Sequence, residues 1–255
     1  MVSRSFFFAF TAAACWAQSP VSPLSFRQEV ASVQPSKPSV PLTAEMRGDI
    51  LMARKVFRDA VEMYQSAGST AILANKIGIA YHQMLELDLA RKSYQRAIKM
   101  DPKYSEAVNN LGTVYYARKN YRKAVSQYNK ALKLKPNSAS IYSNLGTAQF
   151  ARKKYKQALA AYEAALALDP EVFEHRGSNG VLLQERSVQE RAKFHFYLSK
   201  TYAKAGAVDR AISYMRKALE EGFKERDKFR SEPEFAKMQD NVEFQQLLAS
   251  EPRVL

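Results

Sequence analysis

Two polar positions in the middle of the chain recur 34 residues apart. Asn109 and Asn110 lie in the stretch NNLGTVYYARKNY, and Ser143 and Asn144 occupy the same positions in SNLGTAQFARKKY. An asparagine amide both donates and accepts hydrogen bonds, which suits the backbone of an extended peptide and requires no particular peptide side chain. The alternative is that these amides only bond to neighbouring helices. Both interpretations remain open at the level of the sequence.

A second repeated feature is a basic cluster at the end of each stretch, which we call the basic edge. Its residues are Arg118, Lys119, Arg122, Lys123, Arg152, Lys153, Lys154 and Lys156. Such a cluster could contact an acidic protein or an anionic surface, although a charged turn is usually only solvated. The formal net charge of +14 is compatible with each of these and does not choose among them.

The residue types needed for catalysis are sparse. The three histidines are His82, His175 and His195, and they lack the spacing of metal ligands. The sequence also has no nucleophile motif and no glycine loop that could hold a phosphate. We therefore expect no catalytic residue, no metal and no cofactor.

The N-terminus has the pattern of an export signal. MVSRSFFFAFTAAACWAQS combines Arg4, a short apolar run and small residues near Ala17, so residues 1–17 are predicted to be a signal peptide. The protein is then expected to be periplasmic or secreted, without a nucleic acid partner or a membrane span after cleavage. The alternative is that Cys15, in the stretch AAAC, carries a lipid anchor.

The export signal is followed by a change in composition. Residues 18–42 are rich in Ser and Pro and show no hydrophobic period, so an extended, disordered linker is expected there.

A 34-residue period organises the chain beyond this linker. Starting at Ala71, Ser105 and Ala139, three blocks place the same residue types at equal offsets. These positions are Gly78, Gly112 and Gly146; Ala90, Ala124 and Ala158; Tyr94, Tyr128 and Tyr162; Ala97, Ala131 and Ala165; and Pro102, Pro136 and Pro170. Apolar spacings of three, four and seven predict two amphipathic helices in each block, and the proline ends the second. The small residues are expected to let the paired helices approach closely.

The pattern L-G-x-x-Y, then A-x-x-x-Y-x-x-A, then P resembles the tetratricopeptide repeat family. The resemblance implies an all-α, right-handed superhelical solenoid of antiparallel helix pairs over residues 43–225. The expected repeats are 43–68, 71–104, 105–138, 139–172 and 192–225. In the last of these, Ser199 replaces the glycine, Met215 the aromatic residue and Phe223 the proline. Terminal repeats are often atypical, because they close the stack.

The resemblance also implies where a ligand would bind, because the first helix of each pair lines a concave groove in this family. The exposed positions expected there are Asn75, Lys76, His82, Asn109, Asn110, Thr113, Tyr116, Ser143, Asn144, Thr147, Phe150, Tyr197, Lys200 and Lys204. Some members hold a carboxylate with a clamp of two lysines. The matching positions in this chain are Asn75, Ser140 and Asn144, which argues against a carboxylate clamp.

Two segments lie outside the period. Residues 173–191 interrupt it, and GSNG between apolar flanks predicts a small β-hairpin there. Ser187 is expected to cap the helix that follows. Residues 226–255 are predicted to form a helical cap on the open end of the stack, with helix starts at Ser231 and Asn241.

The sequence as a whole predicts a non-enzymatic scaffold or assembly factor that binds a protein or peptide partner in its groove. One alternative is a lipid-anchored assembly factor for a pilus, secretion or outer-membrane machine. Another is an accessory subunit of enzymes that act on envelope polysaccharide, with the basic edge contacting a polyanion.

Overall fold

The computed structural model describes residues 41–174 and 187–250, and the regular secondary structure of these ranges is helical. Contacts divide the chain into two units, residues 1–41 and residues 42–255, so all of the helices belong to the second unit. Their bounds are α1 Ala44–Ala53, α2 Phe57–Ser66, α3 Ala71–Gln83, α4 Leu87–Met100, α5 Ser105–Ala117, α6 Tyr121–Leu134, α7 Ala139–Ala151, α8 Tyr155–Leu168, α10 Val188–Lys204, α11 Val208–Glu220, α12 Lys228–Ser231, the 3-10 helix η1 Pro233–Met238, and α13 Val242–Ala249.

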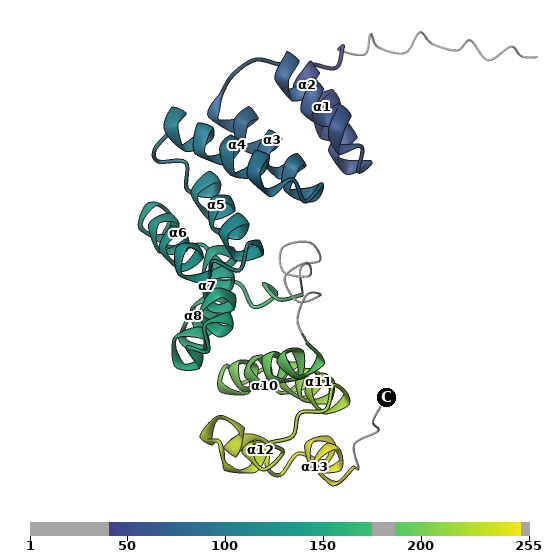
Figure 1. Cartoon of the computed structure of the whole chain (residues 1–255). Coiled ribbons are helices and arrows are strands. Elements are labelled where there is room, and N and C mark those ends of the chain that lie inside the picture. The colour runs from purple at the N-terminus through teal and green to yellow at the C-terminus, as the bar shows by residue number, and fades with distance from the viewer. Residues whose placement is uncertain (1–40, 175–186, 251–255) are drawn as a thin grey trace, which may run out of the picture. The chain divides into compact units, whose positions relative to one another are not determined.

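The helices are arranged as pairs that follow one another along the chain (Figure 1). The most extensive contacts join α1 to α2, α3 to α4, α5 to α6, α7 to α8, and α10 to α11. Each pair also contacts the next, through α2 with α3, α4 with α5, α6 with α7, and α8 with α10. This is the all-α solenoid of stacked helix pairs that the 34-residue period predicted.

The repeated glycine and tyrosine belong to one packing unit in each pair. A Cβ atom built on Gly78 would lie 2.5 Å from Cε1 of Tyr94, and one on Gly146 would lie 2.4 Å from Cε1 of Tyr162. Real side chains do not approach so closely, so the glycine is needed to admit the ring of the second helix. The close approach expected at this position is thus an approach of the glycine backbone to the tyrosine ring.

In the last pair, different residues occupy the positions of the glycine and the tyrosine. Ser199 takes the place of the glycine, and its hydroxyl donates a hydrogen bond of 2.7 Å to the carbonyl oxygen of Ala211. Met215 takes the place of the tyrosine, and both Ser199 and Met215 are completely buried. A flexible methionine can pass beside a Cβ atom that would collide with a rigid ring, so the two replacements belong together.

The turn within each pair contains one residue in the left-handed conformation. Leu85, Lys119 and Lys153 occupy equivalent positions with φ angles of 62°, 58° and 60°. The N–H groups around them close the preceding helix: Lys119 donates to the carbonyl of Tyr116, and Asn120 donates to that of Tyr115, both at 2.8 Å. This is a helix C-terminal motif that usually carries glycine at the left-handed position.

The C-terminal helices cover the end of the last pair with aromatic residues. Phe196 of α10 stacks on Phe223 at 4.5 Å between ring centroids and meets Phe229 at 5.1 Å. Phe235 and Phe244 continue this buried cluster. We refer to these five residues as the phenylalanine cluster.

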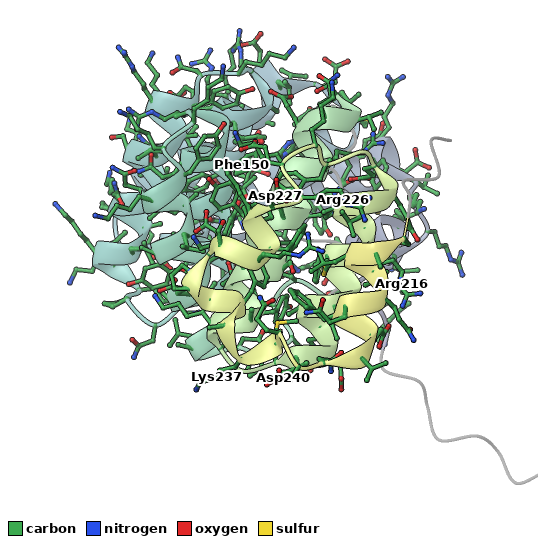
Figure 2. The ribbon with its side chains drawn as sticks, turned by 90° about the horizontal axis from the view of Figure 1, so that it is seen from below. Phe150, Arg216, Arg226, Asp227, Lys237 and Asp240 are labelled. Carbon is green, nitrogen blue, oxygen red and sulfur yellow. The ribbon has the colours of Figure 1, made fainter. Side chains whose placement is uncertain are left out.

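Polar groups also hold the C-terminal helices together, and one of them, Arg226, is labelled in Figure 2. Arg226 donates to the carbonyl oxygens of Leu247 and Ser250 at 2.8 and 2.6 Å and so binds the end of α13. Asn241 caps the start of α13, as predicted, with its side-chain oxygen accepting from the N–H of Phe244. The expected cap at Ser231 is wrong, because Ser231 is the last residue of α12.

Only the flanks of the segment between α8 and α10 can be compared with its prediction, because the GSNG hairpin lies outside the described residues. Ser187 caps α10 as predicted, accepting from the N–H of Glu190 at 3.2 Å. On the other flank, the ring of Phe173 lies 5.4 Å from Tyr162 and 6.2 Å from Tyr202. Phe173 therefore packs between the fourth and the fifth helix pair.

Candidate functional site

A groove of about 690 Å³ lies along the first helices of three consecutive pairs. Helix α3 contributes Ile79 and His82, helix α5 contributes Asn109, Asn110 and Thr113 among others, and helix α7 contributes Ile141 and Asn144. These helices meet side by side because each pair stacks on the next, which places every first helix on one face. We call this hollow the amide groove.

Four asparagines form a chain of hydrogen bonds across the three helices, which we call the amide ladder. Asn144 donates to Oδ1 of Asn109 at 3.1 Å, Asn109 donates to Oδ1 of Asn110 at 3.3 Å, and Asn110 donates to Oδ1 of Asn75 at 3.1 Å. The amides therefore do bond to neighbouring helices, which was the alternative to peptide binding, but these bonds use only some of their donors and acceptors. The ladder also holds the amides in fixed orientations.

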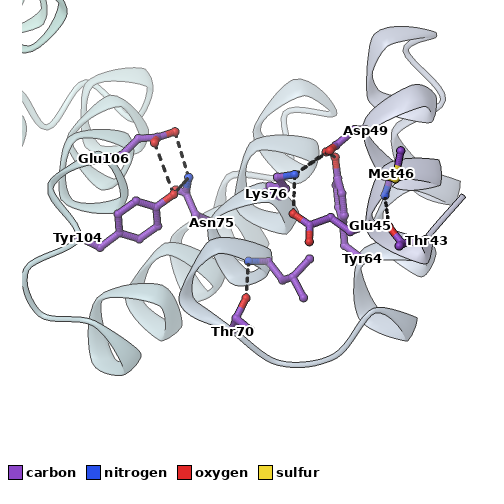
Figure 3. A network of polar contacts seen from close by, with 11 residues as sticks. Thr43, Glu45, Met46, Asp49, Tyr64, Thr70, Asn75, Lys76, Tyr104 and Glu106 are labelled. Carbon is purple, nitrogen blue, oxygen red and sulfur yellow. Dashed lines mark hydrogen bonds and ion pairs between the residues drawn. The ribbon is translucent and has the colours of Figure 1, made fainter. Parts of the chain in front are cut away.

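The direction of the amide ladder is set by a carboxylate at one end. Nδ2 of Asn75 donates to Oε1 of Glu106 and to the hydroxyl of Tyr104, both at 3.2 Å (Figure 3). A carboxylate only accepts, so Asn75 must turn its nitrogen toward Glu106 and its oxygen toward the next amide. The same orientation then passes along the ladder to Asn144, whose Oδ1 is buried and accepts no hydrogen bond within the described residues.

The expected groove residues differ widely in their exposure. The half-buried or exposed residues are Lys76, His82, Asn109, Asn110, Thr113, Tyr197, Lys200 and Lys204. Six others are buried against neighbouring helices: Asn75, Tyr116, Ser143, Asn144, Thr147 and Phe150. Within the ladder, Asn109 and Asn110 are thus the amides with exposed surface. Each has a second N–H that the ladder does not use.

The lysines expected in the groove are engaged in ion pairs. Lys76 contacts Glu45 at 2.8 Å and Asp49 at 2.7 Å, and Tyr64 donates to Asp49 at 2.8 Å (Figure 3). Burial alone would lower the pKa of Lys76, but its hydrogen bonds to the two carboxylates outweigh this and raise it. The network joins α1, α2 and α3.

Toward the C-terminus the lysines are paired in the same way. Lys200 lies 2.5 Å from Glu232 and 3.2 Å from Glu234, and Lys204 contacts both oxygens of Glu163 at 2.8 Å. Lys76, Lys200 and Lys204 therefore stabilise contacts between elements of the solenoid. Sequence reasoning placed them on the expected helices but could not see the acidic partners, which lie 27 to 41 residues away.

His82 lies where the amide groove meets the turns between paired helices. Its Nδ1 is 3.5 Å from the hydroxyl of Thr113. Burial disfavours the charged imidazolium and lowers the pKa of His82 below its ordinary value. A neutral imidazole with one donor and one acceptor is therefore the dominant form at neutral pH.

The basic edge is brought together by the stacking of the second and third repeated blocks. A shallow hollow of about 580 Å³ is lined by Arg118, Arg122, Arg152 and Lys154 among other residues. Arg118 also pairs with Asp88 at 2.7 Å, which offsets part of the positive charge. The structure thus places basic residues from two turns along one surface.

The described parts of the chain contain no cluster of three or more His, Cys, Asp or Glu side chains placed to hold a metal ion. In the same residues, no helix has both the length and the apolar character needed to cross a membrane.

The fold and the groove define a class of protein, an α-solenoid built from 34-residue helix pairs. Family models of the TPR repeat and the tetratricopeptide repeat match residues 78–118, 112–151 and 139–172. Residues 78–172 therefore consist of tetratricopeptide repeats. Such solenoids are scaffolds for interactions between proteins and are generally not enzymes. No curated protein matches this chain in sequence.

Similar solved structures include a crystal structure of MamA, which is 20% identical, covers 68% of this chain and 93% of its own, and has a TM-score of 0.48. Another is the second TPR domain of human RPAP3 in complex with an HSP70 peptide, at 22% identity, 42% and 92% coverage, and a TM-score of 0.40. A third is the first TPR of Spaghetti bound to an HSP90 peptide, at 28% identity, 45% and 89% coverage, and a TM-score of 0.40.

Proposed function

We propose that this protein is a scaffold that binds an extended segment of a partner protein in the amide groove. The observation that carries the proposal is the orientation of Asn109 and Asn110. Both amides are held in place by the amide ladder, both keep an exposed surface, and both line a groove long enough to span three helices. A preorganised amide loses little freedom when it binds a peptide backbone.

The chemistry of the groove suits a backbone better than a single side chain. Each amide has an N–H and a lone pair left for a ligand, which together match the C=O and N–H of an extended chain. Each such bond contributes about 0.5–1.5 kcal/mol, so two amides alone cannot hold a peptide at micromolar concentration. Further contacts are needed, and the apolar surfaces of Ile79 and Ile141 in the groove are available for them.

The proposal is tested by selecting peptides from a displayed random library against the full-length protein. The dissociation constant of a selected peptide is then measured on the wild type, on Asn110→Ala and on Asn129→Ala. Asn129 is an exposed asparagine of α6 outside the groove, so it controls for the substitution itself. We expect a loss of affinity of about two- to tenfold for Asn110→Ala, from one hydrogen bond, and no change for Asn129→Ala. Equal affinities for all three proteins would contradict the proposal, provided that circular dichroism shows an intact fold.

We further propose that the protein works outside the cytoplasm. The support is the pattern of residues 1–17, in which a basic start, an apolar run and small residues follow one another. A scaffold with this leader would assemble proteins in a cell envelope or in the medium, and a lipid on Cys15 would hold it at a membrane. The proposed scaffold requires neither a catalytic residue nor a nucleic acid partner.

A further inference from the structure

A second hollow, of about 440 Å³, lies at the turns between paired helices, and we call it the aromatic trough. Its floor includes Tyr116 and Tyr121 from one repeat and the equivalent residues Phe150 and Tyr155 from the next. Within each repeat the two rings touch, with centroids 5.1 Å apart for the first pair and 5.4 Å for the second. The trough is therefore a repeated structure built by the solenoid.

Lysines surround this aromatic floor. Lys119, Lys153 and Lys193 line the trough together with one acidic residue, Glu190. The ammonium of Lys193 lies 4.3 Å from the centroid of the Tyr155 ring, a distance at which a cation is attracted to the face of the ring. The edge of the trough thus carries more positive than negative charge.

These lysines differ from those of the groove in their partners. Lys76, Lys200 and Lys204 are neutralised by carboxylates of neighbouring elements. Within the described residues, by contrast, no carboxylate lies within ion-pair distance of Lys119, Lys153 or Lys193. The aromatic floor is therefore bordered by lysines whose positive charge no carboxylate of the described residues neutralises.

The aromatic trough adjoins the amide groove, because His82 and Leu85 line both hollows. A partner segment that extends past these two residues would contact both. The two hollows offer different chemistry along one path. The groove presents amides to a backbone, and the trough presents rings and ammonium groups to side chains.

We infer that the aromatic trough binds an acidic segment of the partner protein, with one aliphatic or aromatic side chain seated against the half-buried rings of Tyr121 and Tyr155 and its neighbouring carboxylates beside the three lysines. The inference rests on the proposed function and names the chemistry of the segment bound. Charge complementarity selects the acidic side chains. The aromatic floor selects the apolar anchor, because burying such a side chain removes apolar surface from water.

A protein segment explains the trough better than an anionic membrane or polysaccharide does. The aromatic residues line a hollow that can receive an apolar side chain. A lipid surface or a polymer of charges would use the exposed residues of the basic edge and would not need the rings. The position of the trough beside the amide groove also suits a peptide that contacts both hollows, whereas a membrane surface would not enter the groove.

The test uses a peptide from the library selection and a matched peptide in which each Asp and Glu is replaced by Asn and Gln. Both are titrated against the full-length wild type, against Lys119→Gln with Lys153→Gln, and against Lys130→Gln with Lys133→Gln. The last variant loses the same charge from the exposed side of α6, outside both hollows. We expect selected peptides to place acidic residues beside an apolar one. Replacing the acidic residues of the peptide by amides should lower the affinity by about fivefold or more, and so should the Lys119/Lys153 variant. Both losses should be smaller at high salt. The Lys130/Lys133 variant should bind as the wild type does.

The outcomes separate this inference from the proposed function. In one outcome, peptide affinity falls in Asn110→Ala and stays unchanged in the Lys119/Lys153 variant. That result would support peptide binding in the amide groove and would overturn the inference that the trough binds an acidic segment. If the library yields no binder, both are overturned. In that case heparin and vesicles that contain phosphatidylglycerol serve as probes, and binding that is lost in the Lys119/Lys153 variant would assign the trough to a polyanion.

Discussion

A Cβ atom on Gly112 would lie 2.6 Å from Cε1 of Tyr128, so the first helix of this pair can carry no side chain where the ring of the second helix packs. The ring is completely buried and cannot move into solvent. The relationship is repeated between Gly48 and Tyr64 at the start of the solenoid. The first four helix pairs are therefore packed at a spacing that a missing side chain on the first helix permits.

The first prediction concerns this packing. Gly112→Ser should lower the free energy of unfolding by about 1–3 kcal/mol, because the added atoms overpack the pair. Adding Tyr128→Met should recover part of the lost stability. In the last pair, Ser199 and Met215 occupy the positions equivalent to Gly112 and Tyr128, and both are buried. Urea unfolding of both single variants and the double variant measures the coupling. Strictly additive losses would show that the serine and the methionine are independent choices.

The second prediction concerns the amide ladder. Asn144→Ala should lower the free energy of unfolding by about 1–3 kcal/mol, because it leaves the oxygen of Asn109 without its donor and opens a space between α5 and α7. The exposed Asn129→Ala should change it by less than about 0.5 kcal/mol. Chemical denaturation compares the two. A neutral Asn144→Ala would mean that the ladder has no structural role.

The third prediction concerns the left-handed turn residues. Lys119→Gly should be more stable than Lys119→Ala by about 1 kcal/mol, because glycine adopts a φ of 58° without the steric cost that a Cβ atom imposes. Both variants remove the same charge, so the comparison isolates the backbone. Thermal unfolding gives the difference. Equal midpoints would indicate that the turn relaxes when its side chain is changed.

The fourth prediction concerns pH. Burial lowers the pKa of His82 from the ordinary value of 6.5, so the unfolded chain binds a proton more readily than the folded one. The corresponding stability is complete above pH 6.5 and is lost as the pH falls from there toward the folded pKa. His195 acts in the same direction: burial lowers its pKa, although Glu221 at 2.7 Å opposes the shift.

Unfolding free energies measured between neutral and mildly acidic pH test this assignment. The wild type should become less stable on acidification, and His82→Gln should show a weaker dependence because one titrating group is gone. An identical pH dependence in wild type and variant would exclude His82 as a source.

The fifth prediction concerns export. The mature protein should begin at Gln18, after removal of residues 1–17, when the full-length chain is expressed with its leader in a bacterial host. Intact-mass spectrometry of the purified protein gives the position. A mature chain that begins at an acylated Cys15 would instead establish the lipid anchor, and Cys15→Ser should then release the protein from the membrane.

The repeat pattern could predict the solenoid because each repeat uses the same residues for the same contact. Gly78, Gly112 and Gly146 are separated by one period, and so are the tyrosines that pack on them. Local spacing was enough to place the helices and the turns. It was also enough to find Asn110 and Asn144 as equivalent positions.

The partners of the groove residues could not be predicted, because they lie in other repeats or in the C-terminal cap at offsets that differ from the 34-residue period. Asn144 bonds to Asn109, which is not its equivalent position, and Lys200 pairs with acidic residues beyond the last helix pair. A comparison of the sequence with itself detects equal offsets only. One signal was present, however: an aromatic residue recurs at 121 and 155, directly after each basic turn, and these residues line the aromatic trough.

The phenylalanine cluster has a consequence for the order in which the chain opens. In a stack where each pair contacts mainly its neighbours, the two ends can melt independently of the middle. At the N-terminal end, α1 leaves Met46 and Ile50 partly in solvent, whereas α10 at the other end is covered by buried rings. Amide hydrogens should therefore exchange first in α1 and α2 and last in α10. A partner segment bound across α3, α5 and α7 would then lie on a solenoid that unfolds from its N-terminal end.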